Sequence, residues 1–385
     1  MARTPRVRRT VDSATSNRWF GLKKNLARGD LSKFTLRPDP ASVLSDDVGQ
    51  AYLQDVSIPA IVTAGDGPAS KSVRGDNKVY LDVGGQPLVA RVVSVLQHVP
   101  EVSEVWVVGN AERLEAVFSD PEFRAQIHKP LHVVQQFRNL YENAWKTFRL
   151  LLPAAGPDGR DPKGEEVDRP VLYLSSDLPF ATPQEISEFI RRSIELDCDY
   201  AMGIVPEEAL RDFYPTADGA PGIEMAYFNT REGRLRQSNL HYAKPARILN
   251  RYYIEDMYEH RYQKEFGHIL RLAWTIMRSE QGGLRTLFLY VLIHLAGVAN
   301  RRNFRTIANW LRQLVSLASV EQSVGSLLRT DFRFVATEVG GCAVDIDNEQ
   351  EYAVVTQRFD EWSAAQSEKA ERMYGAPSLP PGESA

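Results

Sequence analysis

Short apolar runs recur between residues 58 and 205, and each run is separated from the next by a more polar stretch. Runs of four to seven apolar residues bounded by polar or glycine-rich positions are typical of buried strands. These runs cover residues 58–64, 105–108, 131–134, 171–175 and 200–205. Strands are therefore predicted at these five places.

Helices are predicted between the strands. One begins at Gln86-Pro87-Leu88, where proline falls near the first turn, and another follows Asn139. A third begins at Thr182-Pro183-Gln184-Glu185, which has the pattern of a capping box. Strands that alternate with helices in this way predict an α/β fold with a Rossmann-like, mostly parallel sheet covered on both faces.

The pattern changes after residue 205. Residues 224–242 resemble a hairpin-like excursion, and residues 252–329 are helical in pattern, with a capping-box start at Ser319-Val320-Glu321-Gln322. A strand is predicted at 332–339 and a last helix ends near Arg372. The expected organisation is an irregular basic arm (1–55), an α/β core (56–250), a helical insertion (251–330), a return to the core (331–372) and a disordered tail (373–385).

Composition indicates a soluble globular protein. The 385 residues are 43% hydrophobic and 25% charged, and the net charge of −4 gives no general attraction to nucleic acid. Two cysteines without metal-type spacing favour a reducing cytoplasm. The most apolar stretch, 286–300, is shorter than the ~20 residues of a membrane-spanning helix, so we expect a buried helix there, with an interfacial helix as the alternative.

Two acidic segments are the main candidates for chemistry. Asp177 directly follows the predicted strand 171–175, and ligands of open α/β sheets bind where strands end. Asp345 and Asp347 alternate with Ile346, so both carboxylates point to one face of an extended segment. Carboxylates in such positions can hold Mg²⁺ against a nucleotide phosphate. The alternative is that these residues cap helices or are simply solvated.

A glycine-containing loop and a lysine are the candidates for binding phosphate. Gly65-Asp66-Gly67 follows the first strand, and backbone amides in such a loop can bind phosphate oxygens. The spacing matches neither a P-loop nor a dinucleotide fingerprint. Lys78 could neutralise charge at an attacked phosphorus. A plain turn and a solvated lysine are the alternatives.

The order of these segments resembles the MobA-like (molybdopterin guanylyltransferase-like) NTP transferase family. The likeness rests on Ala64-Gly65 with Gly67, on Lys78, on Gly85-Gln86-Pro87-Leu88, on Ser176-Asp177-Leu178-Pro179 and on the segment 343–352. The sequence departs from the family at Asp66, where glycine is usual, and at Ala69, where arginine is usual. Lys71 and Arg74 are nearby basic residues.

The resemblance implies a fold of the nucleotide-diphospho-sugar transferase type and transfer of a nucleoside monophosphate with release of pyrophosphate. It implies a nucleotide-binding loop of Ala64, Gly65, Asp66, Gly67 and Lys71. Catalysis would fall to Lys78 and Asp177, and Mg²⁺ would be the cofactor, held by Asp177 and Asp345 with Asp347 as a further ligand.

Four side-chain amides and one lysine are weaker candidates for binding the base or the acceptor. Gln135, Gln136 and Asn139 follow the third strand and could read a base edge through paired donors and acceptors. Asn239 and Lys244 could face the acceptor. Each of these residues could equally be an ordinary loop or surface residue.

The expected function is therefore a cytoplasmic, Mg²⁺-dependent nucleotidyltransferase. We expect CTP rather than GTP as donor and a small phosphorylated alcohol, polyol or sugar as acceptor. A nucleotide-sugar-dependent glycosyltransferase and a non-catalytic regulatory relative are the alternatives. No nucleic-acid partner is expected, whereas lipid contact through the basic arm or helical insertion and a homo-oligomer are both compatible with the sequence.

Overall fold

The computed structural model describes residues 56–66, 72–254 and 313–377, all within one unit of the chain, Pro38–Ala385. The basic arm (1–55) and the apolar stretch 286–300 lie outside these residues, as does most of the predicted helical insertion. No helix among the described residues is both long enough and apolar enough to cross a membrane.

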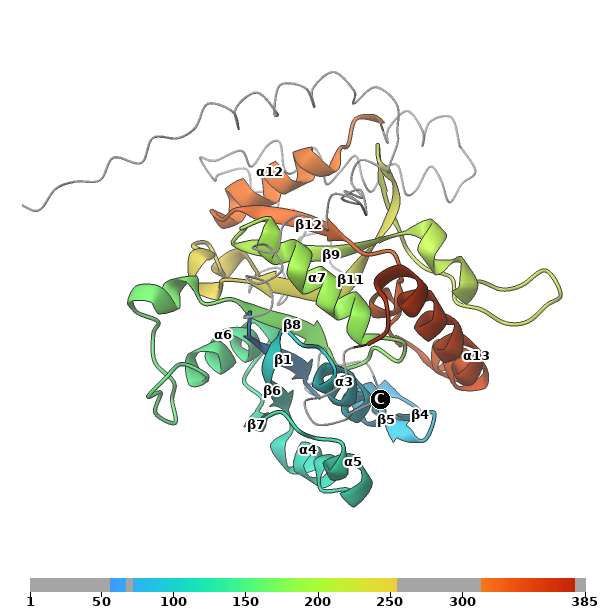
Figure 1. Ribbon diagram of the computed structural model, residues 1–385, viewed down its shortest axis with the longest axis horizontal. Helices are drawn as coiled ribbons and strands as arrows, with labels where there is room; N and C mark the ends of the chain where they lie inside the picture. Colours follow the sequence, from blue (N-terminus) through green and yellow to red (C-terminus); the bar gives the residue numbers. More distant parts are fainter. Residues whose placement is uncertain (1–55, 67–71, 255–312, 378–385) are drawn as a thin grey trace, which may run out of the picture. The chain divides into compact units, whose positions relative to one another are not determined.

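An eight-stranded sheet forms the centre of the described structure (Figure 1). Seven strands follow one another in the order β12-β9-β11-β8-β1-β6-β7, and β10 pairs with β11 outside this path. The strands are β1 (Ile58–Ala64), β6 (Val102–Gly109), β7 (Leu131–Gln135), β8 (Val171–Ser175), β9 (Tyr200–Pro206), β10 (Phe228–Thr230), β11 (Gly233–Ala243) and β12 (Phe332–Ala336). All the strands predicted from apolar runs are present.

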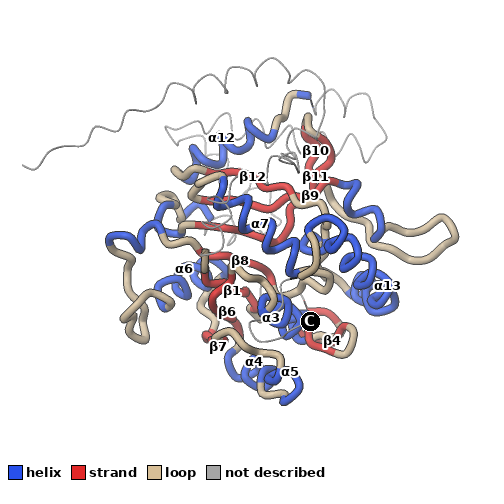
Figure 2. Tube along the Cα trace, in the orientation of Figure 1, coloured by secondary structure: helices blue, strands red, loops and turns tan. Residues whose placement is uncertain are grey.

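The pairing confirms the Rossmann-like, mostly parallel α/β fold. Strand β1 is parallel to β6 and β8, β6 is parallel to β7, and β12 is parallel to β9. Strand β11 is antiparallel to both of its main-sheet neighbours, β8 and β9. The prediction of a separate hairpin-like excursion is therefore only half right: β10 and β11 form a hairpin (Figure 2), but β11 also fills the middle of the sheet.

Helices cover the sheet and close its connections. The α-helices are α3 (Leu88–Gln97), α4 (Ala111–Phe118), α5 (Pro121–Ala125), α6 (Leu140–Leu150), α7 (Pro183–Glu195), α12 (Leu317–Leu328) and α13 (Glu349–Tyr374). Short 3-10 helices occur at Lys78–Tyr80, Gly164–Asp168, Glu207–Phe213, Pro245–Arg247 and Gly341–Ala343. Two small ribbons pair β2 (Ser72–Val73) with β3 (Asp76–Asn77) and β4 (Asp82–Val83) with β5 (Gln86–Pro87).

Side-chain caps decide where several helices begin. The Thr182 side chain accepts a hydrogen bond from Glu185 N, which confirms the predicted start of α7. The capping box predicted at Ser319 is wrong, because Ser316 caps α12 one turn earlier. Glu321, the acidic residue of that predicted box, instead accepts a hydrogen bond from Phe334 N (2.8 Å) and so fastens α12 to β12.

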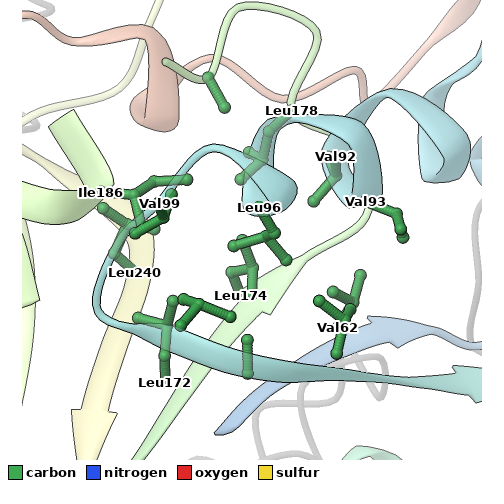
Figure 3. Close-up of a cluster of buried hydrophobic side chains, with 14 of the residues drawn as sticks. Val62, Val92, Val93, Leu96, Val99, Leu172, Leu174, Leu178, Ile186 and Leu240 are labelled. Atoms are coloured by element: carbon green, nitrogen blue, oxygen red, sulfur yellow. The ribbon is translucent and has the colours of Figure 1, made fainter. Parts of the chain in front are cut away.

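The hydrophobic core lies on both faces of the sheet. On one face, side chains of α3 and α7 pack on β1, β6 and β8, and Figure 3 shows Leu96, Leu172 and Leu174 meeting there. On the other face, Phe148 of α6 packs with Ile61 of β1. Because neighbouring strand residues point to opposite faces, β1 can be buried on both sides, as a central parallel strand should be.

The strand order reverses between β1 and β8. From β1 the chain adds β6 and then β7 on one side, and it returns to place β8 on the other side of β1. Such a switch point leaves a crevice beyond the carboxyl ends of the two strands, where ligands of open α/β sheets bind. The segments that begin at Gly65 and Ser176 leave the sheet at this crevice.

Truncating a core leucine tests the packing of this sheet. Leu172 in β8 is completely buried, so Leu172→Ala should lower the free energy of unfolding by about 2–5 kcal/mol. Leu196, which is 48% exposed, is the matched control, and Leu196→Ala should cost less than about 0.5 kcal/mol. Chemical denaturation measures both values. Equal effects of the two substitutions would contradict the assigned core.

Candidate functional site

The end of β1 forms one wall of the crevice. Ala64 is buried at the last position of the strand, and Gly65 follows it beneath the side chains of Gln136 and Asn143. A Cβ at position 65 would lie 3.4 Å from Gln136 Oε1 and 3.5 Å from Asn143 Nδ2, which is ordinary van der Waals contact. Gly67 and Lys71, the other predicted loop residues, lie outside the described residues.

Lys78 is carried into the crevice by a short 3-10 turn. Asn77 caps this turn by accepting a hydrogen bond from Val79 N, and its side-chain amide donates to Gly65 O (3.3 Å). One residue therefore ties the lysine-bearing turn to the loop after β1. The Lys78 ammonium forms ion pairs with Asp177 and, at 3.1 Å, with Asp347 Oδ1.

Asp177 is fixed at the carboxyl end of β8. Its side chain is buried, with an exposed fraction of 3%, and it accepts a hydrogen bond from Ser175 Oγ in addition to the Lys78 contact. Leu178 and Phe180 on the same turn are buried in the core and so prevent the turn from moving away. A carboxylate held in this way points into the crevice without the freedom of a surface aspartate.

The C-terminal acidic segment brings the other two carboxylates. Ile346 is completely buried and faces the core, while Asp345 and Asp347 on either side of it face the crevice, as their alternation predicts. Arg236 of β11 donates to Asp345 Oδ1 (2.8 Å) and also to Ala343 O (2.7 Å). The structure therefore brings together Lys78 and all three predicted metal ligands.

The charges interact strongly because the site is partly shielded from water. Burial raises the pKa of Asp345, and the neighbouring Asp177 carboxylate raises this pKa further, against the opposing effect of Arg236. Burial alone would lower the pKa of Lys78, but the Asp177 and Asp347 carboxylates outweigh it and hold that pKa well above its usual value. Asp177 therefore lies close enough to Asp345 to raise the pKa of Asp345.

The donor set fits a magnesium ion that arrives with phosphates. Within the described part of the chain, no group of three or more His, Cys, Asp or Glu side chains is already arranged around a metal position. Mg²⁺, however, is usually bound by one or two carboxylates together with water and substrate phosphates, not by a complete protein cage. Oxygens of Asp177 and Asp345 meet this requirement.

Only one of the three predicted base-reading amides is free of a capping role. Gln135 accepts a hydrogen bond from Ala111 N at the start of α4, and Asn139 caps α6. Gln136, in contrast, is held beside the loop after β1: its Nε2 donates to Asp66 Oδ1 (2.6 Å) and its Oε1 accepts from Asp66 N (2.9 Å). Asp66 thus fixes the orientation of the Gln136 amide.

The two predicted acceptor-binding residues lie toward opposite ends of the neighbouring strand β8: Asn239 is inside β11, and Lys244 directly follows it. Asn239 lies near the crevice and donates to Cys342 O (3.4 Å). The structure does not bring Lys244 to the site, because β11 runs antiparallel to β8 and places position 244 at the amino end of β8. There Lys244 pairs with Asp197 (3.2 Å).

A cavity of about 160 Å³ adjoins the acidic segment. Its lining residues are Ile223, Glu224, Met225, Ala226, Arg236, Val344, Asp345, Asp347 and Glu351. Among these, Arg236 is the one cationic side chain. The cavity opens beside Asp345 and Asp347, so a molecule bound in it would lie next to the candidate metal position.

Residues 60–211 match the family model of the MobA-like NTP transferase domain. This stretch, which is less than half of the chain, is thus similar to a MobA-like NTP transferase domain. It contains β1, Lys78 and Asp177, whereas Asp345 and Asp347 follow it in the sequence.

Comparison with individual proteins gives more distant similarities. A 2-C-methyl-D-erythritol 4-phosphate cytidylyltransferase of Chlorobium luteolum is 25% identical over 139 residues, which are 36% of this chain and 55% of the relative. The match thus spans about half the length of that relative. A transferase structure from Thermus thermophilus is 19% identical, with a TM-score of 0.48 and coverage of 76% of this chain and 99% of the other. A 4-diphosphocytidyl-2C-methyl-D-erythritol synthase from Anaerococcus prevotii is 11% identical, with a TM-score of 0.38 and coverage of 79% and 99%.

Sequence patterns missed two residues that shape this site. Arg236 contacts Asp345, and Ser175 contacts Asp177. A lone arginine or serine within a strand carries no periodic or motif signal. Only the pairing of β11 with its neighbours shows that Arg236 reaches the acidic segment.

Substitution of Asp345 tests whether its ionised carboxylate destabilises the folded protein when no metal is present. Because the folded-state pKa of Asp345 is raised, the folded protein binds this proton more tightly than the unfolded chain, and stability falls as pH rises through that pKa. Asp345→Asn should therefore raise the Tm of metal-free protein at pH 7, and the gain should vanish below pH ~4, the unfolded-state pKa. Thermal melts in EDTA measure this, with the more exposed Asp347→Asn as control. A lower Tm for Asp345→Asn at pH 7 would mean that the Arg236 ion pair outweighs the repulsion.

Proposed function

We propose that this chain is a Mg²⁺-dependent nucleotidyltransferase that transfers a nucleoside monophosphate from a nucleoside triphosphate to a small acceptor. The preferred donor is CTP, from which CMP is transferred. The proposal is carried by one observation. At the switch point between β1 and β8, Lys78 and Asp177 of the stretch that matches the MobA-like NTP transferase domain meet Asp345 and Asp347, which follow that stretch in the sequence. This is where a sheet of this kind binds its ligand.

The reaction is a substitution at the α-phosphorus. An acceptor oxygen forms a bond to this phosphorus, the bond to the bridging oxygen of the β-phosphate breaks, and pyrophosphate leaves with that oxygen. Such a transfer needs in-line positioning and neutralisation of charge more than covalent help from the protein.

The residues of the site supply these requirements. Backbone amides that follow Gly65 would contact the phosphates, and the Lys78 ammonium would neutralise negative charge at the α-phosphate. Asp177 and Asp345 would hold Mg²⁺, which when bound draws phosphate oxygens together and offsets their charge. Asn239 and the cavity beside Arg236 would face the acceptor, for which we propose a phosphorylated alcohol, polyol or sugar.

The preference for CTP rests on two observations. The curated relative is a cytidylyltransferase, and the amide of Gln136 is locked beside the loop after β1 by Asp66. An amide with a fixed orientation can distinguish a ring with paired donor and acceptor groups from one without them.

Replacement of Asp177 tests the proposed catalytic role. Asp177→Asn keeps the shape of the side chain but removes the charge that would hold Mg²⁺, so Mg²⁺-dependent pyrophosphate release should fall by ~10²-fold or more. Asp168→Asn is the matched control, because Asp168 precedes the same strand β8 at its opposite end and pairs with Arg247. A rate for Asp177→Asn equal to that of the control would remove Asp177 from the site.

A panel of nucleoside triphosphates tests the base preference. A ligand that binds only the folded state stabilises it, by about 2.7 kcal/mol at 100 times its Kd. CTP with Mg²⁺ should therefore raise the Tm more than GTP, ATP or UTP. In Asp66→Ala this preference should narrow because Gln136 Nε2 loses its side-chain acceptor, while the shift caused by Mg²⁺-pyrophosphate stays the same. If no triphosphate raises the Tm, the non-catalytic alternative is favoured.

A further inference from the structure

Glu185, in the first turn of α7, is a fully buried carboxylate whose partners all come from one other segment. Its Oε1 accepts hydrogen bonds from Thr337 Oγ1 (2.8 Å) and Gly340 N (3.1 Å), and its Oε2 accepts from Cys342 N (3.0 Å). A buried carboxylate is costly unless it is hydrogen-bonded, so these contacts fix the position of segment 337–342 relative to α7. The capping-box pattern at Thr182–Glu185 predicts instead that the Glu185 side chain bonds to the backbone N–H of Thr182, at the start of its own helix.

Segment 337–342, which Glu185 holds in place, also packs tightly against the turn that carries Asp177. A Cβ at Gly341 would lie 1.8 Å from Phe180 O, so only glycine allows the two backbones to approach this closely. Gly340 has a φ of +98°, a conformation that side-chain-bearing residues rarely adopt. The segment therefore has little freedom to shift along or away from the Asp177 turn.

Asp345 follows directly from this clamped segment. Cys342 N is the last atom that contacts Glu185, and Asp345 is three residues further along the chain. Glu185 itself follows Asp177 by eight residues, at the start of the helix that continues from the Asp177 turn. One buried carboxylate thus connects the two parts of the chain that bring their acidic residues to the same site.

We propose that Glu185 is a positioning residue that sets the spacing between Asp177 and the Asp345–Asp347 segment, and hence the affinity of the site for Mg²⁺. This inference rests on the proposed function, because it assigns Glu185 to the metal site of that reaction. Glu185 is 0% exposed and is connected to the site through segment 337–342, by the Thr337 side chain and by the backbone amides of Gly340 and Cys342. Groups behind metal ligands typically change metal affinity or activity by about 10–100-fold when they are substituted.

The substitution Glu185→Gln tests this role with little change in volume. The amide oxygen can still accept from Thr337 and Gly340, but the amide NH₂ would face Cys342 N, and two donors cannot bond to each other. The contact nearest to Asp345 is therefore the one that is lost. The Mg²⁺ concentration for half-maximal pyrophosphate release should rise by about 10–100-fold, with a smaller change in the rate at saturating Mg²⁺.

Glu101 provides a matched control. It is also a buried glutamate that contacts α7, accepting from Ser187 Oγ (3.0 Å) and Arg191 Nε (2.6 Å). It directly precedes β6, however, and so lies at the opposite edge of the sheet from the candidate site. Glu101→Gln should lower the Tm without changing the Mg²⁺ dependence.

Hydrogen exchange in the full-length protein gives a second measurement that does not depend on activity. In Glu185→Gln the amides of residues 340–347 should exchange faster than in the wild type, and in Glu101→Gln they should not. If Glu185→Gln matches the Glu101→Gln control in both exchange and Mg²⁺ dependence, the positioning role is wrong. If the wild type releases no pyrophosphate with any triphosphate, the proposed function fails, and unchanged exchange at 340–347 would then overturn the clamp separately.

Discussion

The ion pair between Lys78 and Asp177 is the interaction on which the arrangement of the site depends. Three carboxylates cannot be brought together in a partly buried crevice unless cations offset their repulsion. Lys78 contacts two of them and Arg236 contacts the third. The same lysine is tethered through Asn77 to the loop after β1, so the groups proposed to bind phosphate and those proposed to bind a metal are fixed relative to each other.

The topology of the sheet explains why distant parts of the sequence can meet at this ion pair. The switch point places the ends of β1 and β8 side by side, and the return of the chain through β12 delivers the C-terminal acidic segment to the same edge (Figure 1). Buried contacts at Glu185 then hold that segment in place. Function-bearing residues thus come from loops, while their spacing is set by the rigid sheet and α7.

Sequence patterns predict the parts of this structure that are determined by residues close together in the chain. The apolar run ending at Ala64, the cap at Thr182 and the alternation of Asp345 with Asp347 each follow from short-range periodicity or a side-chain hydrogen bond. Apart from the start of α12, which Ser316 and not Ser319 caps, the failures concern long-range pairing. Nothing in residues 233–243 shows that β11 enters the sheet between β8 and β9, and its antiparallel direction is what sends Lys244 to the opposite edge. The capping pattern predicts that the Glu185 side chain bonds within its own helix, but its partners lie about 150 residues away, and local sequence carries no signal at that distance.

The balance of charge indicates how a metal would enter the site. Three carboxylates face two cations in the described structure, so these five groups carry one net negative charge without a metal. A bare divalent cation would have to compete with the Lys78 ammonium for Asp177 and would leave an excess of positive charge. A cation that arrives with a triphosphate brings compensating negative charge, which can also attract Lys78 away from the carboxylates. On the proposed function, Mg²⁺ and nucleotide would therefore bind together, because each would reduce the electrostatic cost of the other.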